Sequence, residues 1–531
     1  MDLTHAVRWA AERYPDRCAV GGPHPLSYAD WDARTDALAH ALLMIGARPG
    51  SRVALCMAGG EPLASLHLAA QKIAVTSVPL STRLAPAELG YCLADCNPVA
   101  VVVDATTHDL VSAAIDAMAS PPKIAVYGAD APPGADSVEE LLRRAPLGAP
   151  LFGAVESDVS VMLYTSGTTG RPKGVPRSHA AEHAAAVAHL VQTGHAPGDV
   201  TLGVMPMFHT MGLRTLLASV IAGGTWVPQA TFDAEQCLTL IDREQISTLY
   251  LVPTIYWSLA ETGRLSELHS VRRIAYAGAA MSPSLVQRLQ AEIEPERFVN
   301  HFGSTEIYTF SVAPAAALKP GSAGRAGVFS RLRIVDPSPD ARPTDEVSVG
   351  EEGEVAVSLE SPEAFAGYWN RPDANAKSIR NGWYFTGDLA HHDEDGDLWI
   401  SGRVDDMINS GGENVYPDEI ERVLAGCRGV AEVVVSATPS DRWGHAVTAF
   451  VVPPPGVHPD DAILALERFI RDGSGLPSLK RPKRIIAITA VPKSPVGKIL
   501  RRKLTAGEYD RLAVREVPSG SPPAEAREAH R

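Results

Sequence analysis

The chain has 531 residues, of which 45% are hydrophobic and 21% are charged, and it carries a formal net charge of −14. A chain of this length exceeds what one hydrophobic core supports, so two or more domains are expected. The acidic balance excludes a general nucleic-acid binder, and anionic substrates must be met by local basic clusters. Because no run of about 18 apolar residues and no export signal is present, we expect a cytoplasmic protein without a membrane span.

The first 300 residues alternate helical patterns with short apolar runs, as in the helical segment 6–14 and the runs 52–57 and 99–104. Strands that alternate with helices predict parallel sheets with helices on both faces. Further strands are expected at 201–205, 248–252, 272–276 and 297–300. Each run ends in Pro, Gly or a polar loop, where open α/β sheets bind their ligands. The expected fold class is therefore α/β, with a large N-terminal domain of doubly wound sheets.

A second domain is indicated where the pattern changes, near Gly402-Arg403-Val404-Asp405-Asp406. We expect an N-terminal domain over 1–404, a small α+β domain over 405–516 and a disordered tail over 517–531. Within the second domain, 430–437 and 446–453 are expected to pair as strands and 462–472 to form a helix.

A hydroxyl- and glycine-rich loop follows the apolar strand at 162–165, and it carries one lysine, Lys173. Backbone N–H groups of such a loop converge on phosphate oxygens, and the lysine adds a point charge. The loop is not of the Walker type, because Gly170 is followed by Arg-Pro-Lys-Gly. The phosphate-binding positions expected are Thr165, Ser166, Gly167, Thr168, Thr169, Gly170 and Lys173.

This run resembles the signature of the AMP-forming adenylating superfamily, which includes acyl-CoA synthetases, peptide-synthetase adenylation domains and luciferases. The resemblance extends from about residue 10 to 510, and within the superfamily the chain is most similar to benzoate and 4-halobenzoate CoA ligases, chiefly over 402–422. It implies a mobile C-terminal domain and an ATP-dependent acid:CoA ligase that forms an acyl-adenylate. The cofactors and co-substrates implied are ATP, Mg²⁺ and coenzyme A. Whether the protein forms a homodimer is left open by the sequence.

The resemblance also assigns the adenylation residues. Phe302-Gly303-Ser304-Thr305-Glu306 matches the segment whose glutamate holds magnesium, and a single carboxylate near ATP suffices for that ion. Lys498 is implied as the catalytic lysine, because a cation stabilises the charge that develops when a carboxylate attacks the α-phosphate. The remaining nucleotide-binding residues implied are Gly278, Phe302, Thr305, Asp388 and Arg403, where Asp388 meets the ribose hydroxyls.

Coenzyme A binding is assigned to the second domain. The family loop that lines the pantetheine tunnel corresponds to 410–414, and Asp405 falls on the family's hinge position. Residues 480–503 contain nine Lys or Arg and no acidic residue, which favours contact with nucleotide phosphates over a solvated basic face. The residues implied are Gly411, Gly412, Trp443, Arg481 and Lys483.

The acid pocket carries the weakest sequence signal. His209 is implied beside the acyl group, with a buried core histidine as the alternative, and the other lining residues implied are Val187, Thr210, Tyr250, Ala277, His301, Gly303, Tyr308 and Thr309. His301, Tyr308 and Thr309 depart from the apolar halobenzoate pattern, so we expect an aromatic acid with a polar group, such as a hydroxybenzoate or furoate. A medium-chain fatty acid is the alternative. A luciferase-like oxygenase and a non-catalytic nucleotide-binding regulatory protein are the rival functions.

Overall fold

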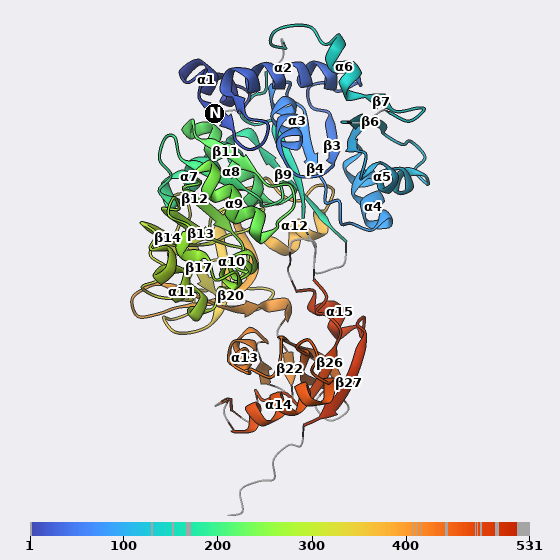
Figure 1. Cartoon of the computed structure of the whole chain (residues 1–531). Helices are drawn as coiled ribbons and strands as arrows, with labels where there is room; N and C mark the ends of the chain where they lie inside the picture. Colours follow the sequence, from blue (N-terminus) through green and yellow to red (C-terminus); the bar gives the residue numbers. More distant parts are fainter. Residues whose placement is uncertain are drawn as a thin grey trace, which may run out of the picture. The chain divides into compact units, whose positions relative to one another are not determined.

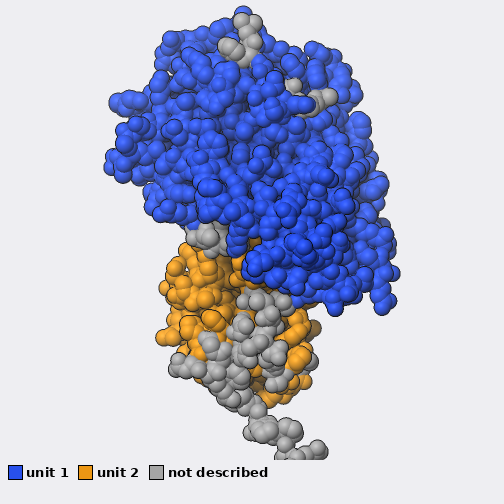
Figure 2. Space-filling model, turned by 180° about the vertical axis from the view of Figure 1, so that it is seen from behind, with its two compact units in different colours: residues 1–386, 391–399 blue, residues 387–390, 400–531 orange. Residues whose placement is uncertain are grey.

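The computed structural model describes residues 3–128, 131–150, 153–165, 171–406, 408–410, 413–415, 417–440, 444–472, 474, 476–477, 480–493, 497 and 499–517. The chain divides into two compact units (Figure 2): Met1–Thr386 with His391–Trp399 form unit 1, and Gly387–Ala390 with Ile400–Arg531 form unit 2. The sequence-based boundary at 404/405 stays a prediction. It lies close to Ile400, where the chain enters unit 2 for the second time.

A seven-stranded sheet forms the first part of unit 1, in the order β7-β6-β5-β3-β4-β8-β9. All neighbouring pairs are parallel except β8 and β9, which form a hairpin. The strand bounds are β3 Arg52–Cys56, β4 Thr76–Pro79, β5 Ala100–Asp104, β6 Lys123–Tyr127, β7 Asp136–Ser137, β8 Val159–Thr165 and β9 Lys173–Ser178. The apolar runs predicted at 52–57 and 99–104 are confirmed as β3 and β5.

Helices cover both faces of this sheet because successive strand side chains point to opposite sides. Val53 and Leu55 of β3 share a core with Leu38 of α2 (Tyr28–Met44) and Leu66 of α3 (Glu61–Lys72). The alternate strand residues, Ala54 among them, pack instead in a core that also contains residues of α4 (Pro86–Cys96) and α5 (His108–Ile115). Figure 1 shows these helix pairs at separate positions around the sheet. Apolar side chains on both strand faces explain the doubly wound arrangement.

A nine-stranded sheet forms the second part, in the order β16-β15-β14-β13-β12-β10-β11-β1-β2. Its central strands are parallel, and β2, β15 and β16 are antiparallel at the edges. The bounds are β1 Cys18–Val20, β2 Leu26–Ser27, β10 Val200–Gly203, β11 Thr225–Pro228, β12 Thr248–Leu251, β13 Arg273–Tyr276, β14 Arg297–Phe302, β15 Ser311–Ala313 and β16 Arg325–Ala326. The four strands predicted between 201 and 300 are confirmed.

The helices of unit 1 have clear sequence boundaries. Helix α7, for example, begins after Ser178, whose hydroxyl accepts from the Ala181 amide, and ends at Gly194, which has a φ of +73°. The bounds are α1 Ala6–Arg13, α2 Tyr28–Met44, α3 Glu61–Lys72, α4 Pro86–Cys96, α5 His108–Ile115, α6 Val138–Arg144, α7 His179–Thr193, α8 Thr210–Ala222, α9 Ala234–Glu244, α10 Pro253–Glu261, η1 Leu265–Glu267, α11 Pro283–Ile293 and α12 Pro372–Ser378.

A third, antiparallel sheet was not anticipated from the sequence. Its order is β17-β18-β20-β19, with β21 paired to β20. The bounds are β17 Leu332–Val335, β18 Gly353–Ser358, β19 Ile379–Arg380, β20 Trp383–His392 and β21 Leu398–Arg403. Its strands come from separated stretches of chain that do not alternate regularly with helices. A search for alternating strands and helices therefore does not predict this sheet.

Unit 2 contains a six-stranded sheet with helices, which agrees with the predicted α+β domain. The predicted strand pair is confirmed as β24 and β25, and the predicted helix as α14. The bounds are η2 Val404–Asp406, β22 Ile408–Ser410, β23 Glu413–Val415, α13 Pro417–Leu424, β24 Glu432–Ser440, β25 Gly444–Val452, α14 Pro459–Asp472, β26 Arg484–Ile488, α15 Arg501–Thr505 and β27 Arg511–Glu516.

Candidate functional site

The carboxyl ends of four parallel strands gather most of the residues predicted for the acid pocket. Strands β10, β12, β13 and β14 are neighbours in the sheet. Tyr250 lies in β12, Ala277 follows β13, His301 lies near the end of β14, and the segment after β10 leads to His209. Open α/β sheets bind ligands at this edge. Residues far apart in the sequence are therefore brought to one edge by the sheet order.

The predicted phosphate loop closes a hairpin. Thr165, the last residue of β8, is the register partner of Lys173, the first residue of β9. The loop residues between them, Ser166, Gly167, Thr168, Thr169 and Gly170, lie outside the described residues. The segment after the loop is a strand, as expected for a loop that is not of the Walker type.

Tyr368 joins the phosphate-loop lysine to the predicted magnesium carboxylate. Lys173 Nζ lies 4.0 Å from the centre of the Tyr368 ring. The Tyr368 hydroxyl donates a hydrogen bond of 2.7 Å to Glu306 Oε1. Sequence reasoning missed Tyr368, because an aromatic residue beside Gly367 carries no spacing signal. The two motifs therefore converge on one buried phenol.

A buried ion triad supports the backbone of the segment that carries Glu306. Arg177 Nη1 donates to the carbonyl oxygens of Thr305 and Glu306, at 2.9 and 3.2 Å. Glu182 binds Arg177 through Oε1 at 2.5 Å and Arg214 through Oε2, and all three side chains of the triad are fully buried. Burial raises the pKa of Glu182, but the charges of Arg214 and Arg177 outweigh it and lower the pKa below its usual value.

Asp388 and Arg403, both predicted for the ribose and phosphate, are paired within unit 2. Arg403 Nη1 lies 2.5 Å from Asp388 Oδ1. Gly387 precedes Asp388 with a φ of +76°, and a Cβ at this glycine would lie 2.9 Å from Arg403 Nη2. The positive φ favours glycine at this position, and the lack of a Cβ leaves room for the guanidinium without a shift of its side chain.

The polar residues predicted for the acid pocket form one buried network of hydrogen bonds and ring contacts. His301 Nε2 lies 3.1 Å from Thr309 Oγ1, and His301 Nδ1 lies 3.2 Å from the Tyr250 hydroxyl. The Tyr250 and His301 rings pack edge to face, with centroids 6.0 Å apart. The His301 and Tyr308 rings stack with centroids 4.4 Å apart. These groups contact one another and are all buried.

Two residues that the sequence did not single out extend this network. The Tyr308 hydroxyl lies 2.8 Å from His189 Nδ1, and Thr309 Oγ1 donates to Glu363 Oε2 at 3.0 Å. His189 Nε2 and Glu363 Oε1 are buried and have no hydrogen-bond partner among the described residues. Unpartnered buried polar atoms are rare and call for an explanation, such as a bound ligand.

Burial sets the protonation of the network. It lowers the pKa of His301 to about 3 and that of His189 well below its usual value. Both imidazoles are therefore neutral near pH 7. Burial also raises the pKa of Glu363 to about 7, although Thr309, Arg177 and Arg214 oppose this shift. Glu363 is thus the titratable group of the network in the neutral pH range.

His209 begins helix α8. Its Nδ1 accepts from the Met211 amide at 3.3 Å, so the ring caps the helix N-terminus. Thr210 Oγ1 is buried without a partner among the described residues. Gly278 adopts a φ of +85°, and a Cβ at Gly303 would collide with the Tyr308 carbonyl. The last predicted lining residue, Val187, is half-buried on α7.

The basic segment predicted for CoA is partly neutralised by acids from other segments of unit 2. Lys480 binds Glu419 at 2.6 Å, and Arg501 binds both Asp418 and Glu421. Arg481 Nε donates to the Leu476 carbonyl. The local excess of charge in the sequence is therefore smaller in three dimensions. Two other residues predicted in this unit are described: Asp405 lies in η2, and the Lys483 amide donates to the Val447 carbonyl. The remaining predicted residues lie outside the described residues: Gly411, Gly412, Trp443 and Lys498.

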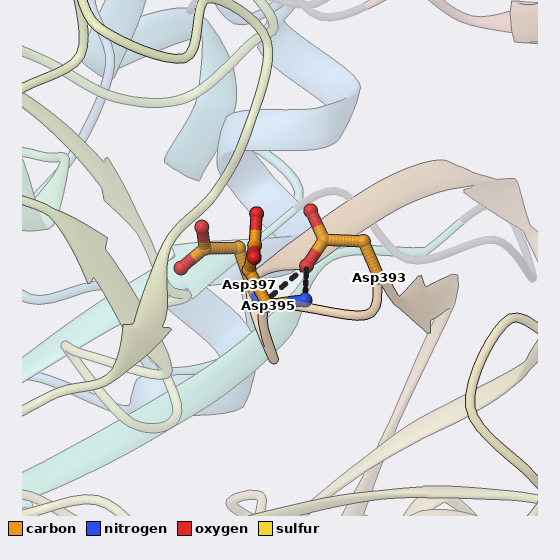
Figure 3. Close-up of side chains that lie close together, drawn as sticks. All are labelled: Asp393, Asp395 and Asp397. Carbon is orange, nitrogen blue, oxygen red and sulfur yellow. Dashed lines mark hydrogen bonds between the residues drawn. The ribbon is translucent and has the colours of Figure 1, made fainter.

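A group of three carboxylates, Asp393, Asp395 and Asp397, lies on the turn between β20 and β21 (Figure 3). The Lys319 ammonium lies 2.6, 2.7 and 2.9 Å from their oxygens. The lysine thus occupies the position that a cation would take, and it ties an earlier loop to this turn.

No helix in the described part of the chain is long and apolar enough to cross a membrane.

Comparison with known proteins identifies the family. The family model for AMP-binding enzymes matches residues 7–369. A second family model, for the C-terminal domain of AMP-binding enzymes, matches residues 419–498. Long-chain-fatty-acid–CoA ligase FadD13 of Mycobacterium tuberculosis is 34% identical over 486 residues, 90% of this chain and 92% of that protein. The 4-chlorobenzoate–CoA ligase of an Arthrobacter species is 31% identical over 517 residues, 94% of each protein.

A solved structure agrees with this assignment. The anthranilate CoA ligase AuaEII in complex with anthranoyl-AMP superposes with a TM-score of 0.86 and 25% identity, over 96% of this chain and 97% of that one. The fold and the two family-model matches define an adenylate-forming enzyme. The chain belongs to the AMP-binding enzyme family and is an ATP-dependent, AMP-forming ligase of the acyl-CoA synthetase type. The non-catalytic alternative is thereby set aside.

Proposed function

We propose that the enzyme activates an aromatic carboxylic acid with a hydrogen-bonding substituent, such as a hydroxybenzoate or a furoate, and transfers it to coenzyme A. The observation that carries this proposal is the buried network of Tyr250, His301, Tyr308 and Thr309 at the predicted acid pocket. Its ends, His189 Nε2 and Glu363 Oε1, are unpartnered. A fatty acyl chain offers neither atom a hydrogen bond, and leaving a buried polar atom unpaired costs about 1–3 kcal/mol.

In the first half-reaction, a carboxylate oxygen of the acid forms a bond to the α-phosphorus of ATP and pyrophosphate leaves. We assign Lys498 to stabilise the charge that develops there, and Lys173 with its loop to hold the departing phosphates. In the second half-reaction, the CoA sulfur bonds to the acyl carbon and AMP leaves. We assign Gly411, Gly412 and Trp443 to that step, after a rotation about Asp405.

The donor set near Glu306 fits a magnesium ion. Magnesium is usually held by one or two carboxylates together with substrate phosphates. Glu306 supplies one carboxylate, and Tyr368 orients it through Oε1. Magnesium would neutralise phosphate charge during displacement of pyrophosphate.

A second candidate substrate is a medium-chain fatty acid. The similarity to the fatty-acid ligase of Mycobacterium tuberculosis favours it, since that relative is at least as similar in identity as the chlorobenzoate ligase. Assembly as a homodimer and a cytoplasmic location stay predictions from the sequence, which size-exclusion chromatography and cell fractionation test.

An acid panel separates the candidates. Benzoate, 3-hydroxybenzoate, 4-hydroxybenzoate, 2-furoate and octanoate are compared by kcat/KM, with pyrophosphate release and thioester formation followed separately. We expect the highest values with the ring acids that carry a hydroxyl or a ring heteroatom. A clear preference for octanoate would refute the aromatic proposal and leave the ligase assignment intact.

A further inference from the structure

Arg177 joins the strand of the phosphate-loop lysine to the segment of the proposed magnesium carboxylate. It lies in β9, the strand that begins with Lys173, and its side chain is fully buried. Its Nη1 donates to the carbonyl oxygen of Thr305 at 2.9 Å and to that of Glu306 at 3.2 Å. These contacts span 128 and 129 positions of the sequence, so only the fold brings the groups together.

The two carbonyls belong to the peptide units on either side of the Glu306 α-carbon. Peptide units are planar, so the two planes together set the backbone dihedrals of Glu306 and with them the direction of its Cα–Cβ bond. One nitrogen of Arg177 contacts both planes. The Ser304 hydroxyl oxygen accepts from the Glu306 amide at 3.1 Å, and the Phe365 amide donates to the Glu306 carbonyl at 2.8 Å. The carboxylate therefore projects from a backbone that is fixed on both sides.

The guanidinium of Arg177 is itself held in one orientation. Its Nε donates to Glu182 Oε1 at 2.5 Å, so a second edge of the group is anchored on α7. Arg214 binds the other carboxylate oxygen of Glu182 and donates to the Glu182 carbonyl at 2.7 Å. A guanidinium is a rigid fork whose nitrogens lie in one plane. With Nε fixed on Glu182, the direction of Nη1 toward the backbone of 305–306 is fixed as well.

Stability alone does not account for this arrangement. Replacing a buried ion triad by apolar residues of similar volume is often neutral or stabilising, because taking the charges out of water can cost more than their attraction returns. A buried triad can instead specify one arrangement of its neighbours. In this chain the neighbour is the backbone of Glu306, whose Oε1 accepts from the Tyr368 hydroxyl at 2.7 Å.

We propose that Arg177 is a positioning residue for the ATP-dependent step, which directs the Glu306 carboxylate toward the metal-bound phosphates by holding the carbonyls of Thr305 and Glu306. This inference rests on the proposed assignment of Glu306 to magnesium. Arg177 acts on the ion only through this backbone. Replacing a group that orients a metal ligand typically lowers metal affinity or activity by about 10–100-fold.

Two substitutions at position 177 test the proposal. Arg177→Met keeps a long side chain and leaves Glu182 paired with Arg214, so neither charge is buried alone. Arg177→Lys keeps the charge beside Glu182, but one ammonium group cannot occupy the positions of both Nε and Nη1. ATP–pyrophosphate exchange is measured as a function of free magnesium, with the acid that the wild type uses best. We expect the magnesium concentration for half-saturation to rise about tenfold or more in both variants.

Binding without turnover gives a second readout. The rise in melting midpoint that ATP causes is measured with magnesium and with a chelator, in the absence of the acid. The magnesium-dependent part of this rise should be smaller in both variants of Arg177 than in the wild type. A purely structural role would lower the midpoint of the unliganded protein and leave the magnesium-dependent part unchanged, and that result would contradict the proposal.

The control is Arg214→Lys, which makes the same exchange in the same triad. Among the described residues, Arg214 makes no hydrogen bond to 305–306, so the variant should keep the wild-type half-saturation even where its melting midpoint falls. An equal rise in Arg214→Lys would show that packing of the whole triad is responsible and would overturn the role of Arg177. Wild-type half-saturation in Arg177→Met would also overturn it. Wild-type half-saturation in Arg177→Lys alone would show that charge suffices and would exclude positioning by the fork.

Glu306→Gln separates this inference from the assignment on which it rests. If Glu306→Gln leaves the half-saturation by magnesium at the wild-type value, the assignment of Glu306 is wrong and the inference falls with it. If Glu306→Gln raises the value and the two variants of Arg177 do not, only the role of Arg177 is refuted. The preference of the enzyme among acids enters neither comparison.

Discussion

The hydroxyl of Tyr368 donates a hydrogen bond of 2.7 Å to Oε1 of Glu306, across 62 positions of the sequence. The phenol is buried, and burial raises its pKa well above the usual value, so it remains a donor at all working pH values. The neutral Tyr368 hydroxyl therefore fixes the position of Glu306 by donating to one carboxylate oxygen, Oε1. The orientation of the proposed magnesium ligand depends on this phenol.

Replacing Tyr368 by Phe removes the donor and keeps the ring beside Lys173. A hydrogen bond to a charged group contributes about 1.5–3 kcal/mol, so we expect adenylate formation to slow by about tenfold or more. ATP–pyrophosphate exchange at several magnesium concentrations measures this effect. Tyr14→Phe is the control, since its ring packs on Arg17 with or without the hydroxyl. Equal rates in both variants would contradict the role of Tyr368.

Replacing Lys498 by Ala should stop the first half-reaction selectively. The loss of one positioned electrostatic group typically lowers the rate by about 10²–10³. Pyrophosphate release should fall by this amount, and thioester formation from a supplied acyl-adenylate should persist. Lys503→Ala, at a half-buried position nearby in sequence, serves as the control. Unchanged pyrophosphate release in Lys498→Ala would exclude the assignment.

Replacing Asp405 by Pro should affect the second half-reaction. Proline fixes φ, so the backbone change expected of a hinge at this position is blocked. We expect adenylate formation close to the wild-type rate and thioester formation reduced by about tenfold or more. Single-turnover measurements of the two steps separate the effects. Asp405→Ala keeps backbone freedom and should retain both steps, whereas equal loss of both in Asp405→Pro would argue against domain rotation.

The strands were predictable from the sequence because buried parallel strands leave continuous apolar runs, as in Arg52–Cys56 and Ala100–Asp104. Motifs that border such strands, including Thr165 and Lys173, could also be located. Tyr368 could not, because its importance arises from contacts with residues distant in the chain. The antiparallel sheet of β17, β18, β19, β20 and β21 was missed for the same reason, since its pairing leaves no periodic signal.

Charge patterns were less informative than motifs. The basic run 480–503 predicted an anion site, but Lys480 and Arg501 are ion-paired with acids from α13. Glu363 could not be found from the sequence for the opposite reason, because a glutamate in a loop is usually exposed. Its burial against Thr309 is a product of tertiary packing, and no local pattern in the sequence encodes it.

Replacing Glu182 by Ala should destabilise the protein strongly. The change leaves Arg177 and Arg214 buried without their partner, and breaking such a group costs about 3–5 kcal/mol. Thermal melting should show a clearly lower midpoint. Glu292→Ala, which removes a partly exposed i,i+4 pair with Arg288 on α11, is the control and should cost about 0.5 kcal/mol or less. Similar melting of the two variants would contradict the importance of the triad.

Glu363→Gln should change how stability depends on pH. The native pKa of Glu363 is raised to about 7 from an ordinary value of 4.5, mainly by burial. The folded chain thus holds this proton more tightly than the unfolded chain does. The stabilisation is fully present below the unfolded pKa and is lost as pH rises through about 7.

The stability of the wild type relative to Glu363→Gln should accordingly fall between pH 5 and pH 8, by on the order of 3 kcal/mol. Melting midpoints of both proteins at several pH values measure the difference. Glu421 of unit 2 has a pKa raised in the same direction, mainly by burial, but it is present in both proteins and cancels. A relative stability that stays constant or rises across this range would show that Glu363 is ionised throughout, and the buried carboxylate would then have to be stabilised by Arg177 and Arg214.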